Sequence, residues 1–343
     1  MPELVRVLVV DDSAYVRKVV TQMLGRSPFI DVIGTARDGE EALEIVAERD
    51  PHVITCDLNM PNMDGVSFVR AQMARKAIPI VIISIAEAAG EQVLAALDAG
   101  AVDFIQKPTA LATERLMDIA DELVEKVKAA AAAPRRATPS AVPSTPLPLV
   151  RTAAVTVDIV VMGISTGGPQ GLKVIIPQLP ADLPVPVALV MHMPIGYTEL
   201  YAQKLNDISA LHVVEASEGQ VVEPGMVFIA PAGRHLSFVK SGGTVLTHLD
   251  LRPLDTPHRP SVDALFQSAA ETYGDRVLGV VMTGMGSDGR DGAAWIKARG
   301  GCILTESEET CVVYGMPRSV VEAGLSDAVV PLSRMAREIM ERI

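Results

Sequence analysis

Three aspartates stand directly after short apolar runs in the first part of the chain. Asp11 and Asp12 follow the run at 5–10, and Asp57 follows the run at 52–56. Such runs predict strands buried on both faces of a parallel sheet, and ligands of open sheets bind at the carboxyl ends of the strands. Carboxylates that converge there repel one another unless a hard cation lies between them, and oxygen ligands suit Mg²⁺. The aspartates therefore predict a magnesium site.

Two further polar residues stand at the ends of later apolar runs. Ser84 ends the fourth run, and Lys107 follows the fifth. A hydroxyl, an ammonium group and Mg²⁺ are what a carboxylate needs to accept a phosphoryl group and to stabilise its charge. The alternative is that Asp11, Asp12 and Asp57 cap the helices that follow them, as aspartate often does. The complete set of five favours the phosphoryl site.

A serine, a histidine and an aspartate stand at the ends of apolar runs in the second part of the chain. Ser165 lies in the turn GISTGGP, His192 ends the run PVPVALVMH, and Asp288 lies in TGMGSDG. On one edge of one sheet they would form a nucleophile, its general base and an orienting carboxylate. A sharp G-x-S-x-G turn lifts its serine to the sheet edge, although glycine-rich turns also begin phosphate loops.

The segment that contains Asp288 also contains Met285 between two glycines. Backbone N–H groups of such a segment could face a developing oxyanion. The simpler interpretation is a strand-to-helix turn in which Asp288 is a helix cap. The chain order Ser, His, Asp differs from the Ser, Asp, His order of α/β-hydrolases, so a different fold is expected.

Two separate sheets are needed to position these residues. Apolar runs alternate with helix-period stretches five times in residues 1–128, which predicts a doubly wound α/β domain. Residues 129–155 are rich in alanine and proline without any acid, which predicts a linker. The alternation resumes in 156–343 and predicts a second, mainly parallel α/β domain. Within it, 232–250 predicts a β-hairpin around 241–243 or an irregular excursion.

The composition limits the class of protein. A length of 343 residues suits two domains, and a hydrophobic content of 49% excludes a mainly disordered chain. The net charge of −12 argues against a nucleic-acid partner. The 3 scattered cysteines, the N-terminus without a signal-peptide pattern and the lack of a long apolar run predict a cytoplasmic protein without membrane insertion.

Residues 4–128 resemble a response-regulator receiver domain. The motifs that carry the resemblance are VDDS at 10–13, CDLNMPNMDG at 56–65, IISIAE at 82–87 and GAVDFIQKP at 100–108. The resemblance implies that Asp57 is phosphorylated, with Mg²⁺ as the cofactor of phosphotransfer. It also implies that Asp12, Asp57 and the backbone carbonyl of Asn59 bind the metal directly, with Asp11 as an outer ligand. The residues that would contact the phosphoryl oxygens are Ser84 and Lys107.

The chain as a whole resembles the chemotaxis response regulator protein-glutamate methylesterase (CheB) family. The motifs are GISTGGP at 163–169, MHMP at 191–194, APAGRH at 230–235, RPSVD at 259–263 and MTGMGSDG at 282–289. The resemblance implies that Ser165 is the nucleophile and His192 the general base and acid. It also implies that Asp288 orients His192 and that the backbone N–H of Met285 is an oxyanion donor, with no cofactor in this site.

The activity that this resemblance implies is hydrolysis of glutamate γ-methyl esters on chemoreceptors with release of methanol, and deamidation of receptor glutamines. A histidine kinase would phosphorylate Asp57 and so relieve inhibition of the esterase by the receiver domain. A monomer is the default expectation. Two alternatives remain open: a receiver-controlled serine hydrolase or amidase in a non-flagellar chemosensory pathway, and a catalytically silent adaptor. A transcriptional output is disfavoured, because the second domain is acidic and has no basic recognition helix.

Overall fold

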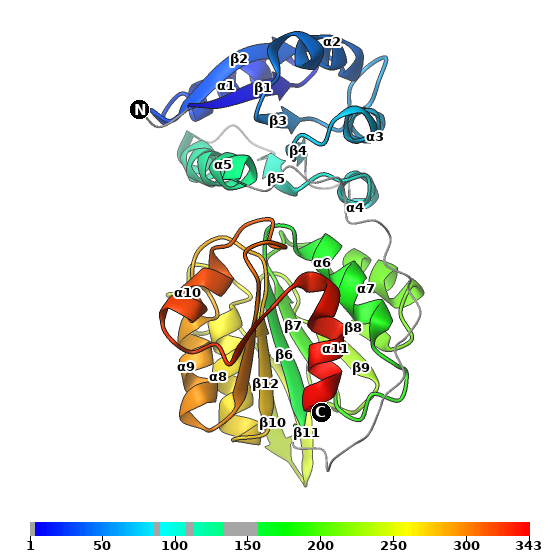
Figure 1. Cartoon of the computed structure of the whole chain (residues 1–343), viewed down its shortest axis with the longest axis vertical. Helices are drawn as coiled ribbons and strands as arrows, with labels where there is room; N and C mark the ends of the chain where they lie inside the picture. The colour runs from blue at the N-terminus through cyan, green and yellow to red at the C-terminus, as the bar shows by residue number, and fades with distance from the viewer. Residues whose placement is uncertain (1–3, 86–89, 108–112, 133–156) are drawn as a thin grey trace. The chain divides into compact units, whose positions relative to one another are not determined.

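The computed structural model describes residues 4–85, 90–107, 113–132 and 157–343 (Figure 1). The chain forms two compact units, Met1–Ser140 and Ala141–Ile343. The division between them falls inside the predicted linker 129–155, of which residues 133–155 lie outside the described residues. Among the helices of the described residues, none is long and apolar enough to cross a membrane.

The first unit is a five-stranded parallel sheet with the strand order β2-β1-β3-β4-β5. Its strands are β1 (Val5–Val10), β2 (Ile30–Ala36), β3 (Val53–Cys56), β4 (Ile80–Ile85) and β5 (Asp103–Lys107). Its helices are α1 (Ala14–Leu24), α2 (Gly39–Arg49), α3 (Gly65–Arg75), α4 (Gly90–Asp98) and α5 (Thr113–Ala132). Helices α1 and α5 pack against each other, and α2, α3 and α4 form the opposite layer. This is the flavodoxin-like order, in which the ligand site lies beside β1 and β3.

The strands of this sheet are buried on both faces, as their unbroken apolar sequences predict. Val7 and Leu8 are neighbours on β1, so their side chains point to opposite faces, and both are fully buried. Helix α5 continues through Ala132, so the predicted domain end at residue 128 is too early. The reason is that residues 129–132 are alanines, which have the highest helix propensity.

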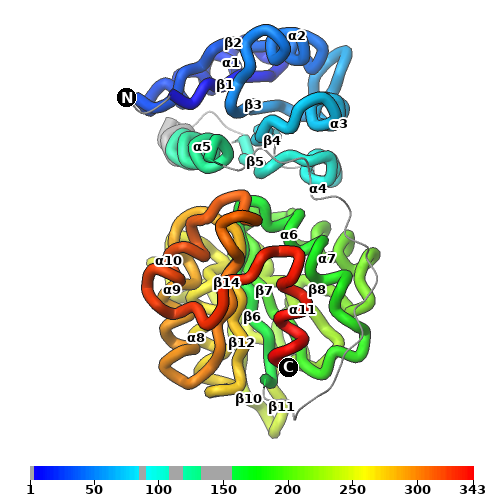
Figure 2. Tube along the Cα trace, in the orientation of Figure 1, coloured from blue at the N-terminus to red at the C-terminus, as the bar shows by residue number. Residues whose placement is uncertain are grey.

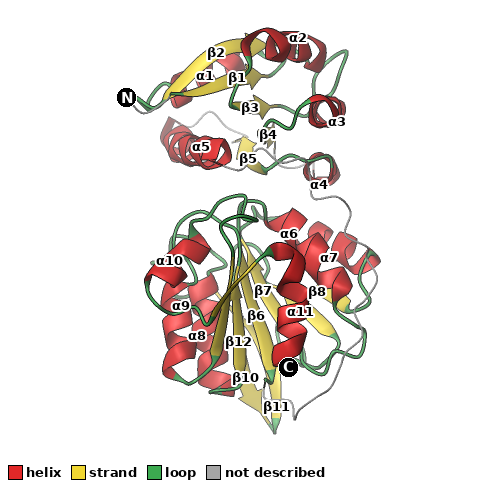
Figure 3. Cartoon of the chain, viewed as in Figure 1, coloured by secondary structure: helices red, strands yellow, loops and turns green. Residues whose placement is uncertain are grey.

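The second unit is a seven-stranded, fully parallel sheet with the strand order β14-β13-β12-β6-β7-β9-β8 (Figure 3). Its strands are β6 (Ile159–Ile164), β7 (Val187–Met191), β8 (His212–Glu215), β9 (Met226–Ile229), β12 (Val277–Val281), β13 (Cys302–Glu306) and β14 (Ala328–Val330). Helices α8 (Val262–Tyr273), α9 (Arg290–Ala298) and α10 (Met316–Glu322) cover one face. Helices α6 (Gly168–Ile175), α7 (Thr198–Asp207) and α11 (Leu332–Arg342) cover the other. The two doubly wound sheets confirm the predicted fold class.

A two-stranded antiparallel hairpin of β10 (His235–Ser241) and β11 (Thr244–Asp250) extends from this unit (Figure 2). Its turn residues Gly242 and Gly243 have φ values of 56° and 89°, which suits the tight turn that joins twisted strands. The predicted hairpin is confirmed. The sequence did not predict β8, β14 or α10, because these elements are too short to show a periodic pattern.

The strands β12, β6 and β7 are neighbours at the centre of the second sheet. The predicted residues Ser165, His192 and Asp288 all follow the carboxyl ends of these three strands. The strand order therefore brings to one sheet edge three segments that are far apart in the sequence.

Candidate active site and phosphoryl site

Ser165 stands directly after β6, in a sharp turn into α6. Its N–H donates to Thr283 O at 3.0 Å, and its carbonyl accepts the N–H of Gly168 at 2.7 Å. Gly167 has a φ of 80°, and a Cβ on it would lie 2.5 Å from Val312 Cγ2, so the turn requires glycine. The serine is partly exposed at the beginning of α6, as the G-x-S-x-G pattern predicts.

The loop after β12 passes beside Ser165. A Cβ on Gly284 would lie 2.8 Å from Ser165 Cβ, so this approach is open only to glycine. Gly284 N donates to Val313 O at 3.0 Å, and Gly284 O accepts the N–H of Met316 at 2.9 Å. Among the described residues, no acceptor is bound to the N–H of Met285. This N–H is therefore available to an oxygen of a bound ligand.

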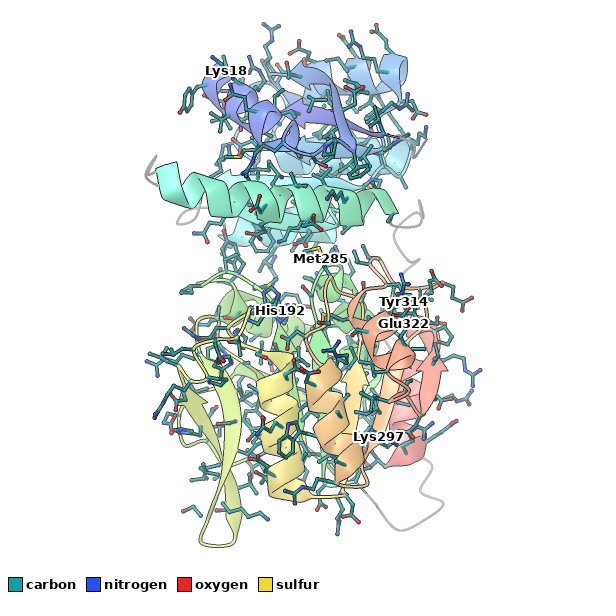
Figure 4. All side chains as sticks on the ribbon, turned by 90° about the vertical axis from the view of Figure 1, so that its left-hand side faces the viewer. Lys18, His192, Met285, Lys297, Tyr314 and Glu322 are labelled. Carbon is teal, nitrogen blue, oxygen red and sulfur yellow. The ribbon has the colours of Figure 1, made fainter. Side chains whose placement is uncertain are left out.

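His192 follows β7 and is held to the neighbouring strand, since its N–H donates to Ile164 O at 3.2 Å. Its Nε2 lies 2.8 Å from Asp288 Oδ2. Its Nδ1 is buried and has no hydrogen-bond partner within the described part of the chain, so no hydrogen bond joins it to Ser165. Hydrogen bonds between catalytic groups are often long without substrate, and one ring nitrogen remains for proton transfer. Figure 4 shows His192 and Met285 toward the same end of the unit.

Asp288 is held by donors on both of its oxygens. Oδ2 accepts from His192 and from Val262 N at 2.8 Å, and Oδ1 accepts from Ser261 Oγ and Asp263 N at 2.9 Å. Burial alone would raise the pKa of Asp288, but these hydrogen bonds, led by that from His192, hold it well below its usual range. The carboxylate is therefore ionised throughout the neutral range, as an orienting carboxylate must be.

Asp288 does act as a helix cap, but on a different helix from the one that follows it. It accepts N–H groups in the first turn of α8, whereas the N-cap residue of α9 is Gly289. The sequence could not show this, because the two segments meet only in the folded sheet. One carboxylate thus both caps α8 and binds His192.

His258 is part of the site, although the sequence pattern gave no reason to select it. Its ring stacks on that of His192, with the ring centroids 4.1 Å apart and the planes inclined by 26°. The only signal in the sequence is its place just before the RPSVD motif, whose serine and aspartate contact Asp288. His258 therefore covers one face of the imidazole and limits how the ring can turn.

The acidic cluster of the first unit has formed as predicted. Each of Asp11, Asp12 and Asp57 offers a carboxylate oxygen, and these oxygens all lie within 4.8 Å of one another. Lys107 Nζ lies 2.6 Å from Asp11 Oδ2 and 3.0 Å from Asp57 Oδ2. The oxygen-only donor set fits a hard divalent cation, while a single ammonium group leaves the cluster with excess negative charge.

The electrostatics of Asp57 and Lys107 follow from their burial and their contact. Burial raises the pKa of Asp57, and the nearby ammonium of Lys107 opposes that shift without cancelling it. Burial alone would lower the pKa of Lys107, but Asp57 and Asp11 outweigh it and raise the pKa. Lys107 is thus a firmly charged ammonium group beside the carboxylate that would accept the phosphoryl group.

Ser84 lies at the end of β4 and is 1% exposed. Its Oγ has no hydrogen-bond partner among the described residues, which is unusual for a buried hydroxyl and suits a contact made only to a ligand.

The alternative role of Asp11, Asp12 and Asp57 as caps of the helices that follow them does not hold, because Ser13 caps α1 and Asp64 caps α3. Asn59 follows Asp57 by two residues in an exposed loop.

Comparison with known proteins gives the same division of the chain. Residues 160–339 match the CheB methylesterase family, and residues 7–121 match the response regulator receiver domain. The crystal structure of the CheB methylesterase catalytic domain of Thermotoga maritima superposes with a TM-score of 0.54 at 43% identity. The match covers 55% of this chain and 99% of that domain.

Two similar proteins match over nearly their full length. One from Myxococcus xanthus, named protein-glutamate methylesterase/protein-glutamine glutaminase 5, is 51% identical over 96% of this chain and 96% of its own. One from Halalkalibacterium halodurans, named protein-glutamate methylesterase/protein-glutamine glutaminase, is 42% identical over 100% of this chain and 99% of its own. These matches agree with the motifs of the sequence and with the two folds. The chain therefore belongs to the CheB methylesterase family, with a response regulator receiver domain.

Proposed function

We propose that the protein hydrolyses glutamate γ-methyl esters on chemoreceptors with release of methanol, and deamidates receptor glutamines to glutamates. The observation that carries the proposal is the 2.8 Å contact between His192 and Asp288 at the ends of strands that flank that of Ser165. The names of the full-length relatives, protein-glutamate methylesterase/protein-glutamine glutaminase, supply the two reactions. Methyl ester and primary amide differ only in the group that leaves, so one acyl-transfer site serves both.

In the proposed mechanism, Ser165 Oγ attacks the ester carbonyl carbon while the free nitrogen of His192 takes its proton. Asp288 stabilises the imidazolium that forms, and the unbound N–H of Met285 donates to the developing oxyanion. The imidazolium then gives its proton to the ester oxygen, which departs as methanol, or to the amide nitrogen, which departs as ammonia, and an acyl-serine remains. Water, activated by His192, attacks this acyl group and releases glutamate and free Ser165. Each step uses groups of this chain and water.

We infer that the receiver domain controls this activity. Asp57 accepts a phosphoryl group from a histidine kinase, and its phosphorylation raises the esterase rate. The carboxylates of Asp12 and Asp57 would hold Mg²⁺ together with the backbone carbonyl of Asn59, with Asp11 as an outer ligand, and the metal would neutralise phosphoryl charge. The residues that would contact the phosphoryl oxygens are Ser84 and Lys107. The unbound Ser84 hydroxyl and the 3.0 Å separation of Lys107 Nζ from Asp57 support these contacts.

The proposal is tested by mass spectrometry of a methylated chemoreceptor after incubation with the full-length protein, acetyl phosphate and Mg²⁺. We expect methylated glutamate peptides to become acids, and selected glutamine peptides to become glutamates. Receptor peptides unchanged after prolonged incubation would contradict the proposal. That result would favour either a hydrolase that acts on another protein or an adaptor without activity. Hydrolysis of some other ester or amide substrate would distinguish the first alternative from the second.

A further inference from the structure

Helices α8 and α9 cap each other through two aspartates. Asp288, which precedes α9, accepts the N–H groups of Val262 and Asp263 in the first turn of α8 at 2.8 and 2.9 Å. Asp263 in turn accepts, on its Oδ1, the N–H groups of Gly289 and Gly292 at 2.9 and 2.6 Å, where α9 begins. Each carboxylate thus satisfies N–H groups that the other helix leaves free. The segment that carries Asp288 is held in place by Asp263.

The close approach of the two helices depends on the glycines between them. A Cβ on Gly292 would lie 2.9 Å from Asp263 Cα and 2.6 Å from Phe266 Cβ, so no larger residue fits. Gly289 has a φ of 100°, which side chains other than glycine rarely adopt. The sequence therefore maintains a direct contact between Asp263 and the start of α9.

The arrangement places two carboxylates side by side behind His192. Burial raises the pKa of Asp263 to about 6, and the charge of Asp288 adds to this, while the N–H groups of Gly292 and Gly289 oppose it. The other titratable groups that face the pair are His192 beyond Asp288, Arg290 on α9 and His235 on β10. Asp263 is thus half-buried and ionised at neutral pH, although burial and the charge of Asp288 make its ionised form less favourable than that of an exposed carboxyl.

We propose that Asp263 is a positioning residue of the hydrolytic site: its carboxylate holds the start of α9, and its negative charge lets Asp288 keep its full charge against His192. This inference rests on the proposed esterase function. When Asp263 takes up a proton, its Oδ1 stays bound to the two glycines, so the proton lies on the oxygen toward Asp288. The neutral group then donates to Asp288, draws charge away from His192 and weakens stabilisation of the imidazolium.

The sign of the pH effect follows from the raised pKa. Above about pH 6 Asp263 is ionised and supports catalysis, and as the pH falls through about 6 it is protonated and kcat falls. Stability changes in the opposite sense. A carboxyl whose pKa is raised in the folded state destabilises that state when ionised. The folded protein therefore loses stability as the pH rises from about 4, where the unfolded chain ionises, to about 6.

The variant Asp263→Asn separates positioning from simple structural support. Its amide oxygen can still accept from Gly289 and Gly292, and its NH₂ group donates to Asp288 at every pH, as the protonated acid would. With the full-length enzyme, methylated receptor, acetyl phosphate and Mg²⁺, we expect kcat at pH 7.5 to fall by about 10- to 100-fold at unchanged KM. The part of the fall in kcat near pH 6 that Asp263 contributes should disappear and leave the profile of the general base alone, while the melting temperature at pH 7.5 should not fall.

The matched control is Asp327→Asn. Asp327 also accepts a backbone N–H, from Ile303 at 2.7 Å, and an ammonium proton from Lys297 at 2.6 Å. Figure 4 shows Lys297 well away from His192. The kcat of Asp327→Asn should equal that of the wild type. A kcat–pH profile of Asp263→Asn that superposes on the wild type would overturn the proposal. So would a parallel loss of activity and melting temperature, which would indicate structural support alone.

A measurement on the wild type serves if Asp263→Asn does not fold. The amide resonances of Gly289 and Gly292 report the charge of the carboxylate that they contact, and both should titrate with a midpoint near pH 6 in NMR spectra of the full chain. Resonances that stay constant between about pH 5 and 8 would overturn the inference. If the wild type releases no methanol, the proposed function fails. The titration still shows, in that case, whether Asp263 ionises near pH 6 beside Asp288.

Discussion

Glu306 Oε2 accepts the backbone N–H of Thr283 at 2.9 Å, directly before the loop that passes beside Ser165. The Glu306 side chain is fully buried, and its Oε1 accepts from Thr310 Oγ1 at 3.0 Å. Burial raises the pKa of this carboxyl, with the Thr283 N–H and the Thr310 hydroxyl opposing the shift. Thr283 O in turn accepts the N–H of Ser165, so a buried acid supports the backbone that carries the proposed nucleophile.

Replacement of Glu306 is expected to destabilise the second unit. Glu306→Ala leaves the buried N–H of Thr283 without its acceptor, removes the 3.0 Å hydrogen bond of the Thr310 hydroxyl and removes buried volume, which should lower the free energy of unfolding by about 3 kcal/mol. Denaturant unfolding measures this change. Glu308→Ala removes an exposed acid from the same segment and should change stability by less than about 0.5 kcal/mol. Equal stabilities of the two variants would show that the buried acid is not a structural support.

Loss of the Asp288 charge should abolish most activity. Asp288→Asn keeps the shape of the side chain but removes the charge that stabilises the His192 imidazolium, so kcat should fall by roughly 10⁴-fold. Steady-state methanol release gives kcat, and circular dichroism checks the fold. Asp291→Asn is the control, because Asp291 has 71% of its side chain exposed. A fall of only a few-fold for Asp288→Asn would assign the orienting role to another residue.

Much of the site could be predicted from the sequence, because a parallel sheet exposes only the ends of its buried strands. The apolar runs before Ser165, His192 and Asp288 therefore placed all three at one sheet edge. The strand order that makes their strands neighbours could not be read from the runs, and neither could the stacking of His258 or the mutual caps of α8 and α9. These features depend on contacts between distant segments, for which the local sequence holds no periodic signal.

The phosphoryl site should require Asp57. Asp57→Asn removes the carboxylate oxygen that would form the bond to phosphorus, so acetyl phosphate and Mg²⁺ should no longer raise the esterase rate. The comparison is the ratio of methanol release with and without acetyl phosphate in each variant. Asp31→Asn changes an exposed carboxylate of the same unit and should keep the stimulation of the wild type. Stimulation of Asp57→Asn equal to that of the wild type would place phosphorylation elsewhere.

The most direct test of the account is methanol release from methylated chemoreceptor by the full-length protein and by Ser165→Ala, each with acetyl phosphate and Mg²⁺. The account predicts sustained release by the wild type and a loss of several orders of magnitude in the variant, with the same circular dichroism spectrum and melting temperature. Release by Ser165→Ala at a rate close to that of the wild type would contradict the account, because the reaction would then use another nucleophile.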